Sequence, residues 1–266
     1  MTCLTPGRPA IAPFPVVAST PTALLLDFDG TIAPTDITVE LLRQLGAPGW
    51  REAVSTLQAG SVGSRIVQDR LLDFLPPDRD VLLEFALAFE LDPGTRPLIW
   101  AARAAGWAVE VTSDGFGFYV APLLRRAGIE IAPRAADVVN GPDGSLRLSA
   151  PYASRGGTRC TTCTACKLDA LLEHRTAGQR VVVVGDGRSD HIVAEEADVV
   201  YATASLAEYC QAVGVDFRPW HRLADVLDDL RRRGELPPAI GAPAPVAPAA
   251  ARSPAPALTP RDRRPS

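Results

Sequence analysis

Residues 23–31 read Ala-Leu-Leu-Leu-Asp-Phe-Asp-Gly-Thr, an apolar run that ends abruptly in two carboxylates, Asp27 and Asp29. Three successive leucines between Thr-Pro and Gly-Thr indicate a short strand that is buried on both faces, as in a parallel sheet. Side chains alternate along a strand, so both aspartates leave it on the same side, at the carboxyl end where such sheets bind ligands. The stretch predicts a catalytic or metal-binding edge. The alternative is a strand that ends in an ordinary Asp-Gly turn.

Composition narrows the class of protein. The 266 residues are 47% hydrophobic, which is enough for one large domain or one domain with a sizeable insertion. The formal net charge of −4 argues against a broad nucleic-acid surface. Five cysteines, an odd number, argue against a disulfide framework and favour a reducing compartment. Prolines interrupt the N-terminal segment and no apolar stretch is long enough to span a bilayer, so we expect a cytoplasmic protein without a membrane partner.

Positive charge is carried almost entirely by arginine. Of the 27 basic residues only Lys167 is a lysine, which leaves 26 arginines. The planar guanidinium fork and the compact ammonium are not interchangeable where a small anion must be met end-on. The lone lysine is therefore a candidate site residue, against the alternative of a single surface lysine left by chance.

Strand and helix patterns alternate along the chain, except in an all-helical block between residues 36 and 92. Apolar residues mark three short helices in this block, near 39–45, 66–75 and 81–89. The elements predicted after it are a helix at 97–105, a strand at 107–112, a helix at 117–126, a short strand at 129–131, a β-hairpin of 137–140 with 145–148, a helix at 167–172, a strand at 180–184, an edge strand at 198–201, and helices near 206–213 and 221–233.

This order predicts an α/β fold, a Rossmann-like doubly wound parallel sheet with an inserted helical cap and a β-hairpin. Residues 36–92 would form the cap, because a helical block here separates two strands that should be neighbours in the sheet. Residues 21–35 and 93–236 would form the catalytic core, preceded by a flexible lead at 1–20. The Pro- and Ala-rich residues 237–266 predict a disordered tail.

Three of the apolar strands end in polar residues that should meet in one crevice. These residues, with the lysine that begins the helix between the last two strands, are Asp27, Asp29, Ser113, Asp114, Lys167, Asp186 and Asp190. Facing carboxylates repel unless a hard cation lies among them, and such oxygen ligands suit Mg²⁺. The hydroxyl of Ser113 and the ammonium of Lys167 suit a phosphoryl group, as do the backbone amides of Gly30 and Asp114. The set predicts Mg²⁺-assisted phosphoryl transfer, against the alternative of unrelated turn residues.

The order of these motifs, from about residue 22 to 233, resembles the haloacid dehalogenase-like superfamily of aspartate-nucleophile phosphatases. The motifs are Asp27-Phe28-Asp29-Gly30-Thr31, Ser113, Lys167 and Gly185-Asp186-Gly187-Arg188-Ser189-Asp190. The helical insertion is similar to the small cap of the phosphoserine phosphatase branch. Residues 113–124, and the cysteine beside the lysine in 163–167, look like the methionine-salvage group that hydrolyses 2-hydroxy-3-keto-5-methylthiopentenyl-1-phosphate.

The resemblance implies a role for each motif residue. Asp27 would attack phosphorus and become an aspartyl phosphate, and Asp29 would protonate the leaving oxygen and later take a proton from water. Ser113 and Lys167 would grip the phosphoryl oxygens. Mg²⁺ would bind the carboxylate of Asp27, the carbonyl oxygen of Asp29 and the carboxylate of Asp186, with Asp190 holding metal-bound water or orienting the lysine. The second aspartate, at position 29, is absent from dehalogenases, so dehalogenation is not expected.

Four features leave alternatives open. Close relatives usually carry Gly-Gly after the motif serine, so the Asp114 side chain could point into the site and oppose a dianion, or point away. Cys160, Cys163 and Cys166 have the spacing of a metal knuckle, but three ligands are one short of a structural zinc site, and a reduced thiol cluster is the alternative. Arg65 could contact the substrate or lie on a solvated face. The aromatic residues at 116, 118 and 119 could line the pocket or pack a helix on the sheet.

The sequence therefore predicts a Mg²⁺-dependent phosphatase that hydrolyses a small-metabolite phosphomonoester through an aspartyl phosphate. An enol phosphate of the methionine-salvage type is the first candidate substrate and phosphoserine the second. The alternatives are a phosphotransferase with the same nucleophile, and a non-catalytic regulatory or binding protein that keeps the fold. The predicted partner is a small phosphate ester, and the sequence does not predict the oligomeric state.

Overall fold

The computed structural model describes residues 20–59, 63–154 and 163–238. Within them lies one seven-stranded sheet in the order β4-β3-β2-β1-β5-β6-β7. Neighbouring strands are parallel, except that β4 runs antiparallel to β3. The strands are β1 (Thr22–Asp27), β2 (Ala108–Phe116), β3 (Arg134–Asn140), β4 (Leu146–Ser149), β5 (Arg180–Gly185), β6 (Val199–Ala202) and β7 (Arg218–Pro219).

Helices cover both faces of the sheet, and the three leucines of β1 contact helices on both sides. Alternate side chains of β1 point to opposite faces. Leu24 and Leu26 join one apolar core and Leu25 joins another, and all three are at most 2% exposed. The first core includes side chains of α5 (Thr95–Ala104), α6 (Gly117–Arg126) and α10 (Leu223–Arg232). The second includes side chains of α7 (Lys167–Thr176) and α8 (His191–Glu196), and α9 (Ala204–Val213) packs on β6 beside it.

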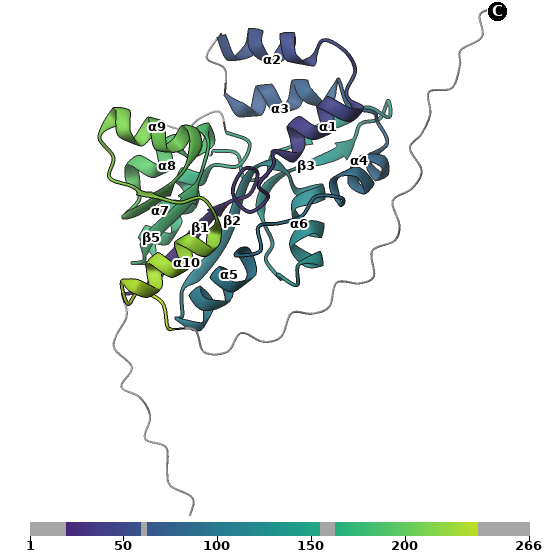
Figure 1. Ribbon diagram of the computed structural model, residues 1–266. Coiled ribbons are helices and arrows are strands. Elements are labelled where there is room, and N and C mark those ends of the chain that lie inside the picture. Colours follow the sequence, from purple (N-terminus) through teal and green to yellow (C-terminus); the bar gives the residue numbers. More distant parts are fainter. Residues whose placement is uncertain (1–19, 60–62, 155–162, 239–266) are drawn as a thin grey trace, which may run out of the picture.

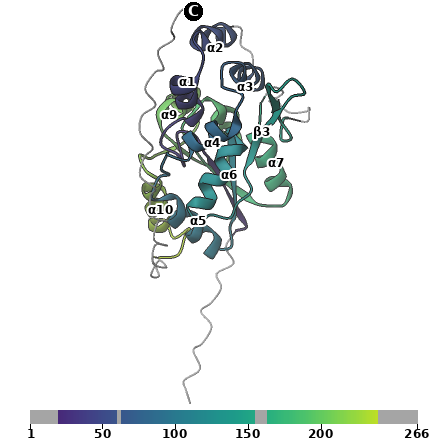
Figure 2. The same cartoon turned by 90° about the vertical axis from the view of Figure 1, so that its right-hand side faces the viewer.

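Between β1 and β2 the chain forms α5 and, ahead of it, four other helices (Figure 1). They are α1 (Ile37–Leu45), α2 (Trp50–Ala59), α3 (Ser64–Leu72) and α4 (Arg79–Ala86). Asp36 caps α1 by accepting a hydrogen bond from the Val39 N–H at 2.9 Å. In Figures 1 and 2, α2 lies at the opposite end of the molecule from α5 and α10. α2 thus lies beyond the end of the sheet where β1 passes into α1, whereas α4 lies beside α6.

The predicted α/β architecture, its parallel sheet and the β-hairpin are confirmed. The strand predicted at 129–131 is wrong, because the chain there has no strand pairing and β3 begins only at Arg134. Gly128, with φ +71°, ends the preceding helix, and Ile129 serves as a buried anchor rather than a strand residue. Asp198–Tyr201 is not the edge strand, since β7 pairs on the outer side of β6.

Some predictions concern the chain ends or the division into domains, and they stay predictions. Residues 1–19 and 239–266 lie outside the described residues, so the flexible lead and the disordered tail stay predictions. The division into cap and core also stays a prediction. The helical block contains α2, which the apolar pattern did not single out. In the described part of the chain no helix has both the length and the apolar character needed to cross a bilayer.

Candidate active site

Asp27 ends β1, and its position in the sheet brings two other strand ends beside it. β1 lies between β2 and β5, and Asp27 pairs with Thr112 of β2. The neighbouring Leu26 pairs with Val184 of β5. Because all three strands run parallel, the residues that follow each of them meet at the same edge. Ser113 and Asp186 are therefore adjacent to Asp27 through the register of the sheet alone.

β2 continues to Phe116, beyond the predicted end at residue 112, and its pairing with β3 is irregular. Thr112 pairs with Arg134 but Phe116 pairs with Ala136, so β2 advances by four residues while β3 advances by two. Such bulges re-aim side chains out of the regular pleat. The shift falls at Ser113, Asp114 and Gly115, and the first two of these are predicted site residues.

Lys167, the first residue of α7, lies between two carboxylates. Its Nζ donates to Asp27 Oδ1 at 2.6 Å, to Asp190 Oδ1 at 2.6 Å and to Ser189 Oγ at 2.7 Å. The lysine side chain is only 4% exposed. Burial opposes its charge, but the carboxylates of Asp190 and Asp27 raise the pKa of the ammonium above its ordinary value. The chain's one lysine is thus a fixed cation in the predicted crevice.

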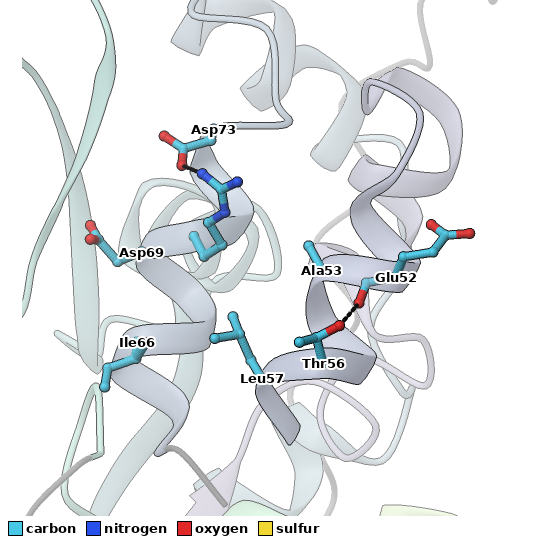
Figure 3. A pocket seen from close by; sticks show the side chains of 8 residues that line it. Glu52, Ala53, Thr56, Leu57, Ile66, Asp69 and Asp73 are labelled. Atoms are coloured by element: carbon cyan, nitrogen blue, oxygen red, sulfur yellow. Dashed lines mark hydrogen bonds and ion pairs between the residues drawn. The ribbon is translucent and has the colours of Figure 1, made fainter. Parts of the chain in front are cut away.

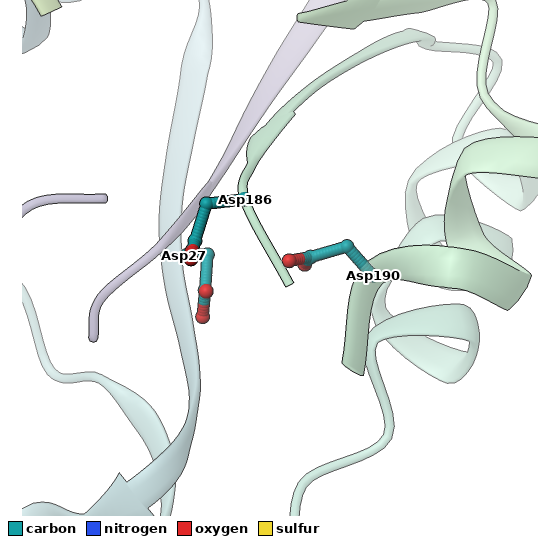
Figure 4. Close-up of side chains that lie close together, drawn as sticks. All are labelled: Asp27, Asp186 and Asp190. Carbon is teal, nitrogen blue, oxygen red and sulfur yellow. The ribbon is translucent and has the colours of Figure 1, made fainter. Parts of the chain in front are cut away.

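Three carboxylates gather around this cation. Asp27, Asp186 and Asp190 each offer one oxygen, and these oxygens lie within 4.8 Å of one another (Figure 4). Burial, followed by the charge of Asp190, raises the pKa of Asp27 despite the nearby lysine. Burial and Asp190 likewise raise the pKa of Asp186. One ammonium does not balance three carboxylates, so the donor set fits a hard divalent cation such as Mg²⁺.

Gly30 allows the close approach of two loops at this cluster. Its φ is +87°, and a Cβ at this position would lie 2.2 Å from Asp186 Oδ2. Thr31 holds the same carboxylate by donating to Asp186 Oδ1 at 3.0 Å. The Gly30 N–H donates to the Ala33 carbonyl at 2.7 Å, so this amide is not free. The phosphate contact predicted for the Gly30 amide stays a prediction, and it would require this amide to leave the Ala33 carbonyl.

Asp29 is held apart from the carboxylate cluster by its own hydrogen bonds. Its Oδ1 accepts from the Ile37 N–H at 2.9 Å. Its Oδ2 accepts from the Tyr119 hydroxyl at 2.8 Å and from Ser113 Oγ at 3.3 Å. Burial, with a further contribution from the Asp36 charge, raises the pKa of Asp29 to about 7, although these hydrogen bonds oppose the shift. Near neutral pH this carboxyl is available in both protonation states, as an acid–base catalyst requires.

The Asp114 side chain points toward the helical block and the loop before Lys167. Its Oδ1 accepts from the Ala165 N–H at 3.5 Å, and the Ser64 hydroxyl of α3 also hydrogen-bonds to the carboxylate. Gln68 of α3 donates to the Asp114 carbonyl at 3.0 Å. Burial raises the pKa of the Asp114 carboxyl. Of the two orientations left open for the Asp114 side chain, the structure thus has the one that points toward α3, outside the carboxylate cluster.

The remaining candidate residues lie outside the carboxylate cluster. Arg65 is exposed on α3. Cys160 is outside the described residues, and Cys163 is disulfide-bonded. A sulfur in a disulfide is neither a thiolate ligand nor a free thiol, so Cys163 is not a reduced member of the predicted cluster. Cys166 is a buried free cysteine whose sulfur accepts from the Asp169 N–H at 3.4 Å, capping α7.

A separate groove of about 520 Å³ lies between α2 and α3 (Figure 3). Its lining residues are Glu52, Ala53, Thr56, Leu57, Ile66, Asp69, Arg70 and Asp73. None of the motif residues lines this groove, and Arg70, a second arginine that could contact the substrate or lie on a solvated face, is paired with Asp73 at 2.5 Å. The carboxylate cluster at the strand ends therefore remains the candidate active site.

Sequence reasoning missed three contacts in this site. Ser189 lies in the quoted fourth motif but was given no role, and it accepts from Lys167. Thr31 likewise belongs to the first motif without a predicted partner. The Tyr119 hydroxyl contacts Asp29, and the aromatic pattern around it gave only a choice between pocket lining and packing. Position within a motif was an available signal for the first two residues, whereas Tyr119 needed the folded structure.

Comparison with solved structures places the fold among phosphoserine phosphatases. A substrate-bound phosphoserine phosphatase complex matches with a TM-score of 0.61 and 18% identity, covering 79% of this chain and 98% of that chain. A phospho-aspartyl intermediate analogue of phosphoserine phosphatase matches with a TM-score of 0.60 and 19% identity, covering 79% of this chain and 99% of the other. At these identities the comparison shows a common fold.

Sequence relatives are more specific in name. A 2-hydroxy-3-keto-5-methylthiopentenyl-1-phosphate phosphatase of Geobacillus kaustophilus is 29% identical over 214 residues, covering 79% of this chain and 95% of that protein. The enzyme of the same name from Exiguobacterium sibiricum is 28% identical over 222 residues, covering 78% and 95%. The family model for haloacid dehalogenase-like hydrolases matches residues 24–195, which include every motif found at the strand ends. The chain belongs to the haloacid dehalogenase-like hydrolase family.

Proposed function

We propose that this hydrolase is a Mg²⁺-dependent phosphatase that cleaves a small phosphomonoester through an aspartyl phosphate formed on Asp27. The observation that carries the proposal is the division of labour between two carboxyls. Asp27 lies 2.6 Å from a buried ammonium and within a carboxylate cluster, whereas Asp29 has separate donors and a pKa of about 7. One carboxyl is suited to attack and the other to proton transfer.

In the first step a carboxylate oxygen of Asp27 attacks phosphorus, and the bond from phosphorus to the ester oxygen breaks. Asp29 gives its proton to the departing oxygen. In the second step water attacks the same phosphorus, Asp29 takes the proton from that water, and Asp27 is released as a carboxylate with free phosphate. Ser113 and Lys167 bind phosphoryl oxygens throughout.

The residues proposed to hold Mg²⁺ are Asp27 and Asp186, through their carboxylates, and Asp29, through its carbonyl oxygen, while Asp190 would hold metal-bound water or orient Lys167. When bound, the ion neutralises negative charge on the carboxylates and on the phosphoryl oxygens. The cluster itself supports this proposal, because Asp27 and Asp190 are buried, Asp186 is half-buried, and one ammonium lies among them.

For the substrate, the named relatives support a small ester. We propose the methionine-salvage enol phosphate first, after the two curated relatives, and phosphoserine second, after the similar structures. Arg65 is proposed as a substrate contact, because it follows Ser64 on α3, and Ser64 contacts the loop beside the site. The cytoplasm remains the expected compartment, and a small phosphate ester remains the expected partner.

The test is phosphate release from a panel of phosphomonoesters that includes both candidates, with and without Mg²⁺. Wild type and Asp143→Asn, a variant in the exposed hairpin turn, should release phosphate from at least one ester in a Mg²⁺-dependent manner. Asp27→Asn should retain its fold and lose at least about 10³-fold in kcat. Turnover that survives in Asp27→Asn would contradict the nucleophile. A folded wild type that releases no phosphate would favour a phosphotransferase or a regulatory protein.

A further inference from the structure

Tyr119 is a buried phenol inside the apolar part of the core. It belongs to α6 and is 0% exposed. Its ring packs edge-on against Phe118 at 5.3 Å and Phe116 at 6.4 Å between centroids, and at a tilt against Phe28 at 6.2 Å. A buried hydroxyl among aromatic rings is costly unless it is hydrogen-bonded. Its two partners therefore indicate what the hydroxyl does.

The hydroxyl lies between the first helix after β1 and the proposed acid–base residue. It donates to Asp29 Oδ2 at 2.8 Å and lies 3.0 Å from Thr38 Oγ1 of α1. The phenolic hydroxyl carries a single hydrogen, so it donates one hydrogen bond. Because that hydrogen points to Asp29, the hydrogen of the second bond must come from Thr38. While the Asp29 carboxyl is ionised, the hydrogen bonds therefore run from Thr38 to Tyr119 to Asp29.

The Asp29 carboxyl is consequently held at both oxygens. Oδ2 accepts two hydroxyl hydrogens, from Tyr119 and Ser113, whereas Oδ1 accepts only the Ile37 N–H. Each carboxylate oxygen has about two acceptor sites, so Oδ1 has one left and Oδ2 has none. Ser113 is also proposed to bind a phosphoryl oxygen, which would turn its hydrogen away. Tyr119 is the other described side-chain donor to Oδ2, and it has no proposed contact with the phosphoryl group.

Gly115 keeps this contact possible. A Cβ on residue 115 would lie 2.0 Å from the Tyr119 hydroxyl and 2.2 Å from Asp29 Oδ2. Any side chain here would separate the two atoms. The bulged end of β2 thus provides the space in which the phenol reaches the carboxyl.

We propose that Tyr119 is a positioning residue for Asp29, which orients the carboxyl and leaves Oδ1 as the oxygen that exchanges the proton with the ester oxygen and with water. The inference rests on the proposed function, since it concerns the residue that protonates the leaving group. Tyr119 lies outside the four sequence motifs, so none of them accounts for how the Asp29 carboxyl is oriented.

The test uses leaving groups that differ in their need for a proton. Para-nitrophenolate leaves without protonation, whereas the alkoxide of phosphoserine does not, so a misplaced acid should slow only the alkyl ester. The value to compare is kcat/KM, because it reports the steps up to loss of the leaving group and excludes hydrolysis of the aspartyl phosphate. Tyr119→Phe removes only the hydroxyl. Tyr201→Phe is the matched control, because it removes another buried phenol, one that donates to Asp229 Oδ2 at 2.8 Å.

We expect Tyr119→Phe to lower kcat/KM for phosphoserine by at least about tenfold and to leave that for para-nitrophenyl phosphate within about twofold. Tyr201→Phe should change neither ratio while lowering the unfolding temperature to a similar extent. An equal loss on both esters, or no loss on either, in a folded Tyr119→Phe would overturn the inference and leave the proposed function intact. If wild type is inactive on phosphoserine, the best alkyl ester of the panel takes its place, and a wild type inactive on every ester of the panel, the enol phosphate included, would overturn the proposed function and the inference with it.

Discussion

The two ends of helix α7 carry charge clusters that differ in kind. Lys167 begins the helix and lies between Asp27 and Asp190, with its side chain 4% exposed. His174 lies in the last turn, about 10 Å along the axis, and pairs with Glu110 at 3.0 Å, with its side chain 17% exposed. The same ten-residue helix therefore presents one cation to the ends of the strands and another to the flank of β2.

The pKa values of the carboxyl groups shift in opposite directions in the two clusters. At the Lys167 end, burial and mutual repulsion raise the pKa of both Asp27 and Asp186. At the His174 end, burial opposes the charge of Glu110, yet hydrogen bonds from His174 and Arg134 lower its pKa. The hydrogen bond from Glu110 in turn raises the pKa of His174. The second cluster is satisfied by the protein alone, while the first keeps surplus negative charge, which is a mark of a site prepared for a ligand.

The largest effect on the Lys167 end is expected from the substitution Lys167→Met. It leaves Asp27 and Asp190 buried without their cation, so we expect a loss of about 3 kcal/mol in unfolding free energy without metal. Phosphate release should fall at least about 10³-fold. Denaturant unfolding and an assay of phosphate release measure the two effects. An active, equally stable Lys167→Met would show that the ammonium neither holds the cluster nor serves the reaction.

Metal binding should distinguish the two ends directly. Mg²⁺ at about 100 times its dissociation constant should stabilise wild type by about 2.7 kcal/mol. Asp186→Asn should lose most of this gain, and its stability without metal should be unchanged or higher, because a repelling carboxylate is removed. His174→Gln is the control and should keep the full response. Thermal unfolding across a Mg²⁺ titration gives these values, and a response unaffected by Asp186→Asn would place the ion elsewhere.

Ser189→Ala is expected to have a smaller effect at the Lys167 end. The ammonium loses one of three partners but keeps both carboxylates, so the cost should be about 1 kcal/mol. Because the lysine is then less well oriented, kcat should fall several-fold. Steady-state kinetics with the best ester of the panel tests this, with Ser55→Ala, at an exposed position of α2, as the control. A loss as large as that of Lys167→Met would mean that the serine has a direct catalytic part.

The smallest effect is predicted at the His174 end and depends on pH. The pKa of His174 is raised on folding, so its contribution is fully present below the unfolded value of about 6.5 and is lost as pH rises through the folded value. His174→Gln should therefore cost about 0.5–1 kcal/mol near pH 5.5 and little near pH 8. Denaturant unfolding at both values measures the difference. A cost that grows with pH would reverse the assigned sign.

The cluster around Lys167 could be predicted from the sequence, because strand ends and helix starts are visible in local sequence patterns. Asp27, Asp186 and Lys167 follow from strands that end on one edge and a helix that begins beside them, and the structure brings them together. The orientation of Asp114 and the Tyr119 contact depend on packing between segments 46 and 90 residues apart in sequence, which no local pattern records. The false strand at 129–131 arose because two isoleucines alternate there as in a strand.

The central claim is that Asp27 carries the phosphoryl group during turnover. The direct measurement is mass spectrometry of peptides from enzyme quenched in acid while it hydrolyses its best ester with Mg²⁺. The account predicts a fraction of the enzyme heavier by one phosphoryl group, located on the peptide that contains Asp27 and absent from Asp27→Asn. Turnover without an adduct on that peptide, or with the phosphoryl group on Ser113, would contradict it.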